Sequence, residues 1–192
     1  MYETATTPTY VSPQEYLASE RLAEAKREYI AGEIVAMAGT SRNHSLIESN
    51  VLAGLHGQLK GKSCETYGPD MRVRIDSTHS YVYPDVVVAC GDIRFEDNHL
   101  DTLVNPTVVI EILSPSTASR DRGIKWQQYR RIPSLVDYLL VAQDQYRIEQ
   151  WTRRSGDIWS TNIIEGLDGI VELASIGCRL ELGDVYERVI IR

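Results

Sequence analysis

The chain has 192 residues, of which 43% are hydrophobic and 24% are charged, as in an ordinary globular protein. This length predicts one domain with a sizeable core, spanning residues 1–192. The net charge of −7 excludes a protein that coats DNA over its whole surface, because phosphate binding needs Lys and Arg. No apolar run approaches the roughly 18 residues that cross a bilayer, and residues 1–11 lack a signal-peptide pattern, so we expect a cytoplasmic protein.

The three cysteines, Cys64, Cys90 and Cys178, are far apart in the chain and include no C-x-x-C pair. An odd number with this spacing is typical of neither a zinc site nor a disulfide framework. We therefore expect three reduced and mostly buried thiols.

The first element is a helix that begins after Ser12. Ser at the N-cap, Pro13 at the first helical position and Glu15 at the third form a strong helix start. The helix is predicted to run to about Lys26. Residues 27–37 then read as a β-hairpin.

The hairpin sequence predicts a turn at Ala31-Gly32. A two-residue loop places Ile30 opposite Glu33 and Glu28 opposite Val35. Glu28 and Glu33 then lie on one face of the hairpin. Solvent exposure explains both glutamates as well as a functional site does.

A second helix is expected over about His44–Lys60, after a loop at residues 39–43. Its apolar residues recur at helical spacing: Ile47, Val51, Leu52, Leu55 and Leu59. His44 and Glu48 fall on the same stripe in the first turns. These two polar side chains either point into a cleft or form hydrogen bonds within the core.

The remaining elements are mostly strands. They are expected at residues 64–75, around Asp85, around Glu111, at 136–142, 146–152 and 158–164, and in two weaker segments near the C-terminus. A third helix is predicted from about Asp121 to Arg131, where Pro133 ends it. This order of elements predicts an α/β fold built around a mixed sheet.

Two carboxylates interrupt two of the apolar runs. Asp85 lies in Tyr83-Pro84-Asp85-Val86-Val87-Val88, and Glu111 lies in Val108-Val109-Ile110-Glu111-Ile112-Leu113. An acid in such a run is costly to bury unless it is paired, protonated or bound to a metal. If the two strands pair antiparallel, the acids meet, because one is near the start of its strand and the other near the end. Adjacent carboxylates suit a hard cation such as Mg²⁺, which can activate water against a phosphodiester.

Basic residues cluster just after the Glu111 strand, at Arg120, Arg122, Lys125, Arg130 and Arg131. Such a cluster can attract phosphate locally in a protein whose net charge is negative. A solvated helix face explains the same pattern, and both interpretations stay open.

Pro84-Asp85 followed by Glu111-Ile112-Leu113 resembles the bipartite motif of the PD-(D/E)XK nuclease superfamily. Over residues 12–151 the chain resembles a bacterial family of restriction endonuclease-like proteins of the Uma type, long catalogued as a domain of unknown function. The matching segments are residues 29–35, His44 in its helix, residues 84–88, residues 109–117, Arg120-Asp121-Arg122-Gly123-Ile124-Lys125, Tyr129 and residues 136–141.

The resemblance implies a restriction endonuclease-like mixed β-sheet core flanked by helices, with an N-terminal helix and a β-hairpin. It also implies a metal-dependent endonuclease that hydrolyses DNA. Asp85 and Glu111 would bind Mg²⁺ or Mn²⁺ with help from the Ile112 carbonyl. The superfamily motif has Lys two residues after the Glu, where this chain has Leu113, so Lys125 would take the role of positioning the nucleophile.

Two further residues belong to segments that match the family. Glu33 matches the acidic residue on the early hairpin and would bind a second metal or a metal-bound water. His44 would contact phosphate or metal. Both are expected to line the cleft that holds Asp85 and Glu111.

Two other functions remain open. The acidic net charge and the missing motif lysine favour a non-catalytic DNA-binding or regulatory module that keeps the fold, whereas Asp85, Glu111 and Lys125 favour the nuclease. A homodimeric interaction module with structural acids is the third possibility. We expect a homodimer in the nuclease case, because cutting both DNA strands usually needs two active sites.

Overall fold

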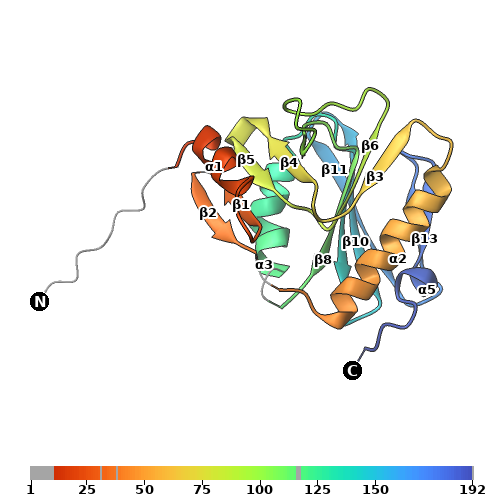
Figure 1. Cartoon of the computed structure of the whole chain (residues 1–192). Coiled ribbons are helices and arrows are strands. Elements are labelled where there is room, and N and C mark those ends of the chain that lie inside the picture. The colour runs from red at the N-terminus through yellow and green to blue at the C-terminus, as the bar shows by residue number, and fades with distance from the viewer. Residues whose placement is uncertain (1–10, 31, 38, 116–117, 192) are drawn as a thin grey trace, which may run out of the picture.

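The computed structural model describes residues 11–30, 32–37, 39–115 and 118–191. These residues form a six-stranded mixed sheet that lies between two other layers (Figure 1). Its strands, in spatial order, are β11 (Ile158–Glu165), β10 (Arg147–Ser155), β9 (Asp137–Ala142), β8 (Val108–Leu113), β6 (Val86–Cys90) and β3 (Cys64–Tyr67). Strands β8 and β9 are parallel, and the other neighbours in this sheet are antiparallel.

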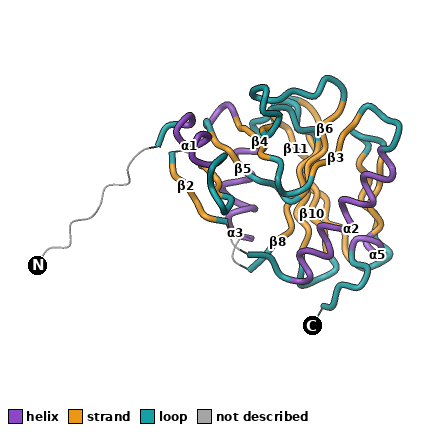
Figure 2. The backbone as a smooth tube through the Cα atoms, viewed as in Figure 1, coloured by secondary structure: helices purple, strands orange, loops and turns teal. Residues whose placement is uncertain are grey.

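One face of the large sheet is covered by helix α2 (Arg42–Leu59), by the hairpin of β12 (Ile170–Leu173) and β13 (Cys178–Glu181), and by the short helix α5 (Leu182–Val185). The buried side chains of this layer include Ile47, Val51 and Leu55 of α2, which confirms the predicted apolar stripe. Figure 2 shows α2 and α5 on one side of the large sheet, and α1, β2 and β5 on the other.

A second sheet and two helical regions lie on the other side. The sheet has the order β2 (Glu33–Ala36), β1 (Arg27–Ile30), β5 (Ser80–Val82), β4 (Arg72–Ile75) and β7 (Thr102–Leu103), with a 3₁₀ turn, η1 (Asp76–Thr78), between β4 and β5. Helix α1 (Pro13–Glu20) packs against it through Tyr16, which stacks on Tyr29. The mixed sheet flanked by helices confirms the predicted fold class.

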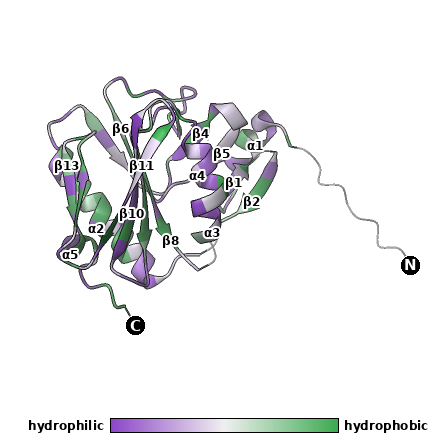
Figure 3. Cartoon of the chain, turned by 180° about the vertical axis from the view of Figure 1, so that it is seen from behind, coloured by the Kyte–Doolittle hydropathy of each residue, from purple (hydrophilic) through white to green (hydrophobic). Residues whose placement is uncertain are grey.

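A helical connection crosses from β8 to the parallel strand β9. It consists of α3 (Ala118–Arg120), the π-helical turn η2 (Asp121–Lys125) and α4 (Trp126–Tyr129), which follow one another directly and are called the crossover helix below. Parallel neighbours require such a crossover, which packs back onto the sheet. Seen from behind in Figure 3, the mostly hydrophobic strand β8 lies between the α2 layer and the layer that contains α4.

Some predicted boundaries were wrong. Helix α1 ends at Glu20 rather than near Lys26, and Arg21 forms ion pairs with Asp97 and Asp101. The single strand predicted over residues 64–75 is two strands, β3 and β4, which belong to different sheets. Gly68-Pro69 separates them, because proline has no N–H to give to a strand ladder.

The hairpin register was predicted correctly. Ile30 lies opposite Glu33 and Glu28 lies opposite Val35. Gly32 has a φ of 98°, which a turn residue without a side chain adopts freely. Its predicted turn partner, Ala31, lies outside the described residues.

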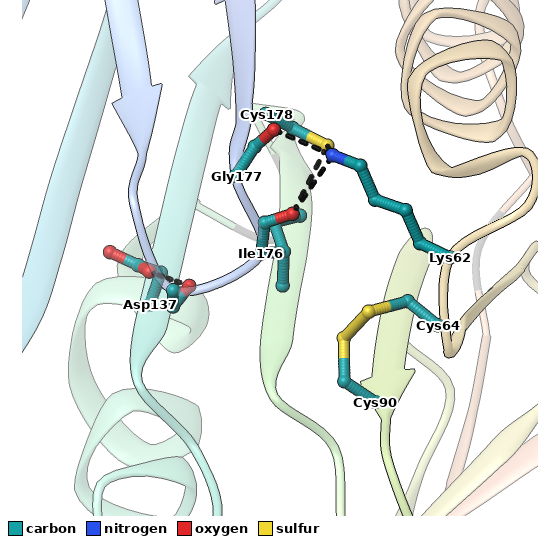
Figure 4. The surroundings of a disulfide bond; sticks show 8 residues. Lys62, Cys64, Cys90, Asp137, Ile176, Gly177 and Cys178 are labelled. Atoms are coloured by element: carbon teal, nitrogen blue, oxygen red, sulfur yellow. Dashed lines mark hydrogen bonds between the residues drawn. A yellow bond between two sulfur atoms is a disulfide. The ribbon is translucent and has the colours of Figure 1, made fainter.

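The prediction of three reduced cysteines was wrong. Cys64 and Cys90 form a disulfide between β3 and β6 (Figure 4). They are direct partners in the antiparallel register, with a Cα–Cα distance of 4.0 Å. Cys178 is a buried free thiol, as expected, and burial raises its pKa. Lys62 Nζ lies 4.0 Å from its Sγ.

No helix in the described part of the chain combines the length and the apolar character needed to cross a membrane.

Candidate active site

A cavity of about 350 Å³ opens where the β1–β2 hairpin, the start of α2, the end of β8 and the crossover helix meet. Several ionisable side chains line it: Glu28, His44, Asp85, Glu111, Arg120, Asp121 and Lys125. Of the predicted site residues, Asp85, Glu111, Ile112, Lys125 and His44 are thus brought together, and Glu33 is not.

Asp85 directly precedes β6, and Glu111 lies in β8, the antiparallel partner of β6. Val86 is the register partner of Ile110 in the antiparallel pair, so the next residues outward, Asp85 and Glu111, lie opposite each other. The Ile112 backbone N–H donates a hydrogen bond of 2.6 Å to Asp85 Oδ2. The predicted antiparallel pairing is therefore confirmed.

The two carboxylates share one face of the large sheet. Side chains alternate along a strand, and Val87 and Val109, two residues from Asp85 and Glu111, both pack in the core between the two sheets. The Ile112 side chain packs on the opposite face, in the α2 layer. What Ile112 presents to the cavity is therefore its backbone.

Lys125 enters the cavity from the π-helical turn of the crossover helix. Its Nζ lies 3.0 Å from Glu111 Oε1, 3.0 Å from Glu28 Oε1 and 3.6 Å from Asp121 Oδ1. The side chain is only 7% exposed, and such π-helical turns are frequent at functional sites. A lysine fourteen residues after Glu111 is thus in contact with that glutamate.

Burial and charge set the ionisation of this pair. Burial favours the neutral amine of Lys125, but Glu111, Glu28 and Asp121 outweigh burial and raise its pKa, so the ammonium form persists. Burial raises the pKa of Glu111, and Asp121, Asp85 and Glu28 add to this effect while Lys125 opposes it.

Glu28 is a site residue that sequence reasoning did not find. It is 2% exposed, its Oε1 accepts a hydrogen bond of 3.2 Å from the Tyr83 N–H, and its Oε2 lies 2.9 Å from Arg120 Nη2. The one available signal was that Glu28 and Glu33 share a hairpin face. That pattern does not say which of them is buried.

Glu33 was expected to line the cavity, and this placement is wrong. It is exposed and lies at the turn end of the hairpin, two residues beyond the pair of Glu28 and Val35. The shared face is real, but only its Glu28 end reaches the crossover helix.

His44 lies at the start of α2, where the Ser41 side chain accepts a hydrogen bond from the His44 N–H and caps the helix. Its Nε2 is 3.3 Å from Asp85 Oδ1, and its Nδ1 is 4.0 Å from Glu48 Oε2. Burial lowers the pKa of His44, but Asp85 and Glu48 outweigh burial and raise it.

Tyr129 is a second site residue that sequence reasoning did not find. It holds the carboxylate of Glu111 in place. Its hydroxyl donates a hydrogen bond of 2.9 Å to Glu111 Oε1. Burial raises the pKa of Tyr129 well above its ordinary value, so the phenol keeps the proton that it donates. Glu111 Oε1 is therefore held from two directions, by Tyr129 and by Lys125.

The basic cluster does not form one open patch. Arg120 pairs with Glu28, Lys125 is buried, and Arg122 Nη2 lies 2.7 Å from Glu149. The guanidinium of Arg130 lies over the ring of Trp126. Most of this positive charge is thus neutralised or covered by the chain itself.

The cavity has more acids than bases and offers oxygen atoms that could hold a divalent cation. Four carboxylates line it, against Arg120, Lys125 and the histidine. Oxygen atoms from Asp85, Glu111 and the Ile112 backbone are the donor type that Mg²⁺ prefers and Mn²⁺ accepts.

A mixed sheet with acids on two paired strands, and a crossover helix that returns a lysine to them, defines a restriction endonuclease-like protein. The chain belongs to the Uma2 family, described as "Putative restriction endonuclease", whose model it matches over residues 13–182. The resemblance drawn from the sequence motifs is thereby confirmed.

Related proteins match most of the chain length. The uncharacterized protein sll1609 of Synechocystis sp. is 35% identical over 168 residues, which are 88% of this chain and 95% of that protein. The uncharacterized protein slr1290 of the same organism is 36% identical over 176 residues, which are 92% of this chain and 91% of that protein. The crystal structure of a "putative nuclease belonging to DUF820" from Anabaena variabilis has a TM-score of 0.77. The match covers 94% of this chain and 99% of the Anabaena chain. At 20% sequence identity it shows a similarity of fold.

Proposed function

We propose that the protein is a metal-dependent endonuclease that hydrolyses phosphodiester bonds in DNA. The observation that carries this proposal is the contact of Lys125 with Glu111 inside a cavity that Asp85 also lines. Membership of the Uma2 family supports the nuclease class.

Asp85, Glu111 and the Ile112 carbonyl would hold Mg²⁺ or Mn²⁺. When bound, such an ion lowers the pKa of a coordinated water and offsets charge on a phosphate. The Ile112 N–H keeps Asp85 in place, and the Tyr129 hydroxyl does the same for Glu111.

Lys125 would act on the water and on the scissile phosphate. A lysine ammonium donates up to three hydrogen bonds and accepts none, so it can orient an attacking water and stabilise developing negative charge. Glu28 and Asp121 also contact the ammonium, and together with Glu111 they raise its pKa and keep it charged.

The substrate would be DNA, bound by a homodimer whose two cavities act on the two strands. The net charge of −7 means that contacts with the phosphate backbone must be local. Binding should therefore weaken only gradually as salt is raised, because few cations contact phosphates and few counterions are released.

One observation favours a second candidate function, a DNA-binding or regulatory module without cleavage. The cations nearest the cavity are largely paired with the chain's own acids, as Arg120 is with Glu28. Such pairing leaves little free positive charge inside the cavity for cleavage, whereas DNA could still contact basic residues elsewhere on the surface.

A plasmid-nicking assay tests the proposed function. Supercoiled plasmid incubated with the protein and Mn²⁺ or Mg²⁺ should become nicked or linear, and EDTA should prevent it. A Glu111→Gln preparation, purified identically, controls for contaminating nucleases. Intact plasmid with a wild-type protein that still binds the metal and DNA would support the non-catalytic module instead.

Glu28→Gln and Glu33→Gln form a matched pair on one hairpin face. Glu28→Gln should reduce nicking on the order of 10²-fold, because a displaced Lys125 no longer points at the reacting groups. Glu33→Gln should stay within about two-fold, since no catalytic contact is lost. The rates are compared at equal folded fraction by circular dichroism. A large loss for Glu33→Gln would restore its predicted catalytic role.

A further inference from the structure

Three metal-ligating side chains, one of them that of Asp85, gather near the start of α2. The possible ligand atoms of His44, Glu48 and Asp85 all lie within 4.8 Å of one another. His44 and Glu48 are one helical turn apart on α2, so they project from the same face of that helix. The proposed endonuclease chemistry gives Glu48 no role.

One buried atom in this group lacks a partner. His44 Nδ1 has no hydrogen bond, although the His44 side chain is only 9% exposed. Its nearest acidic neighbour, Glu48 Oε2, is 4.0 Å away, which is too far for a hydrogen bond. Buried polar atoms are nearly always satisfied, so a nitrogen without a hydrogen bond that faces a carboxylate marks a position that a water or an ion can fill.

The other ring nitrogen is also directed at an acid. His44 Nε2 is 3.3 Å from Asp85 Oδ1, whereas Asp85 Oδ2 is held by the Ile112 N–H. Asp85 therefore presents one oxygen toward the histidine and the other toward the end of β8. A carboxylate placed in this way can serve two neighbouring cations.

We propose that His44, Glu48 and Asp85 bind a second divalent cation, which is a transition ion such as Zn²⁺. Imidazole nitrogen suits Zn²⁺, whereas Mg²⁺ and Mn²⁺ suit oxygen ligands. This position thus differs in ion preference from the all-oxygen position of Asp85, Glu111 and the Ile112 carbonyl. The inference shares Asp85 with the proposed function, but binding of the second ion does not require cleavage.

Nuclear magnetic resonance of the histidine rings tests the site directly. The chain has four histidines, so long-range ¹H–¹⁵N spectra of the full chain resolve few signals. Titration with Zn²⁺ alone should shift the His44 ring signals and saturate at one ion per site. His44→Gln assigns the signal. His56→Gln, an exposed histidine on the same helix, is the matched control and should leave the titration unchanged.

Glu48→Gln should weaken Zn²⁺ binding at this site by at least about tenfold, a loss that substitutions around metal sites commonly cause. Glu24→Gln, at an exposed position, should leave the affinity unchanged. Unshifted His44 signals at saturating Zn²⁺, or equal affinity in Glu48→Gln with its fold intact by circular dichroism, would overturn the proposal.

Glu111→Gln separates this inference from the proposed function. That variant should lose nicking and keep the Zn²⁺-induced shift of His44. A wild-type protein that shifts His44 but never nicks DNA would refute the endonuclease and leave the second site standing. Nicking without any Zn²⁺-induced shift of the His44 signals would support the endonuclease and refute the second metal site.

Discussion

Lys125→Met should lower the rate of plasmid nicking by at least about 10²-fold. Methionine fills nearly the same volume but carries no charge and no N–H donor. The variant therefore removes the group that would orient water and offset charge on the phosphate. It should retain Mn²⁺ binding, because a charged lysine has no lone pair for a metal.

The same substitution should destabilise the fold. Lys125 is the cation shared by Glu28, Glu111 and Asp121, and removing one partner of a buried ion pair costs about 3–5 kcal/mol. Nicking is therefore measured at saturating Mn²⁺ on protein shown to be folded by circular dichroism. Lys60→Met, at an exposed position, is the control for loss of one lysine. Wild-type cleavage by Lys125→Met would mean that another group positions the nucleophile.

Asp85→Asn should abolish metal binding and with it cleavage, by at least about 10²-fold in rate. The amide oxygen of Asn can still accept the hydrogen bond from the Ile112 N–H, so the strand pairing should survive. The charge that attracts a cation is lost. Because Asp85 belongs to both proposed metal positions, the Zn²⁺-induced shift of the His44 ring signals should also become smaller.

Isothermal titration with Mn²⁺ measures this loss directly. Asp144→Asn, in the exposed turn between β9 and β10, removes the same charge at a distance from the cavity and should bind Mn²⁺ like the wild type. Unchanged Mn²⁺ affinity in Asp85→Asn would remove Asp85 from the proposed metal ligands.

The pairing of Asp85 with Glu111 was predictable, because it depends on local patterns. Each acid interrupts an apolar run, and consecutive strands without a helix between them usually pair antiparallel. Alternation then fixes the face on which each side chain lies. The hairpin register was predictable for a similar reason, since a two-residue turn fixes every pair that follows it.

Glu28 was not predictable, because its burial is decided by tertiary packing. It occupies the same hairpin face as Glu33, and only the docking of that hairpin against the crossover helix distinguishes the two. The Cys64–Cys90 disulfide escaped prediction because cysteine spacing does not reveal the register of β3 with β6. The division of residues 64–75 between two sheets is likewise a property of the packed molecule.

The position of Leu113 explains why the lysine lies elsewhere. Leu113 shares the strand face of Glu111, is 5% exposed and packs in the core between the two sheets. A lysine there would have to bury its ammonium among apolar side chains, at a large desolvation cost. The crossover helix instead delivers Lys125 into a ring of carboxylates. The resemblance to the family, rather than any local pattern, pointed to this residue.

The proposed metal ligands and Lys125 are held in the cavity by different contacts. Glu111 and Ile112 belong to β8 of the large sheet and Asp85 directly precedes its partner strand β6, whereas Glu28 comes from the second sheet. A slight separation of the two sheets would thus leave the carboxylates assembled while it released Lys125 and Arg120 from Glu28. Lys125 would then keep only Glu111 and Asp121 as partners. The direction of its ammonium therefore depends on how closely the two sheets pack, whereas the position of the carboxylates does not.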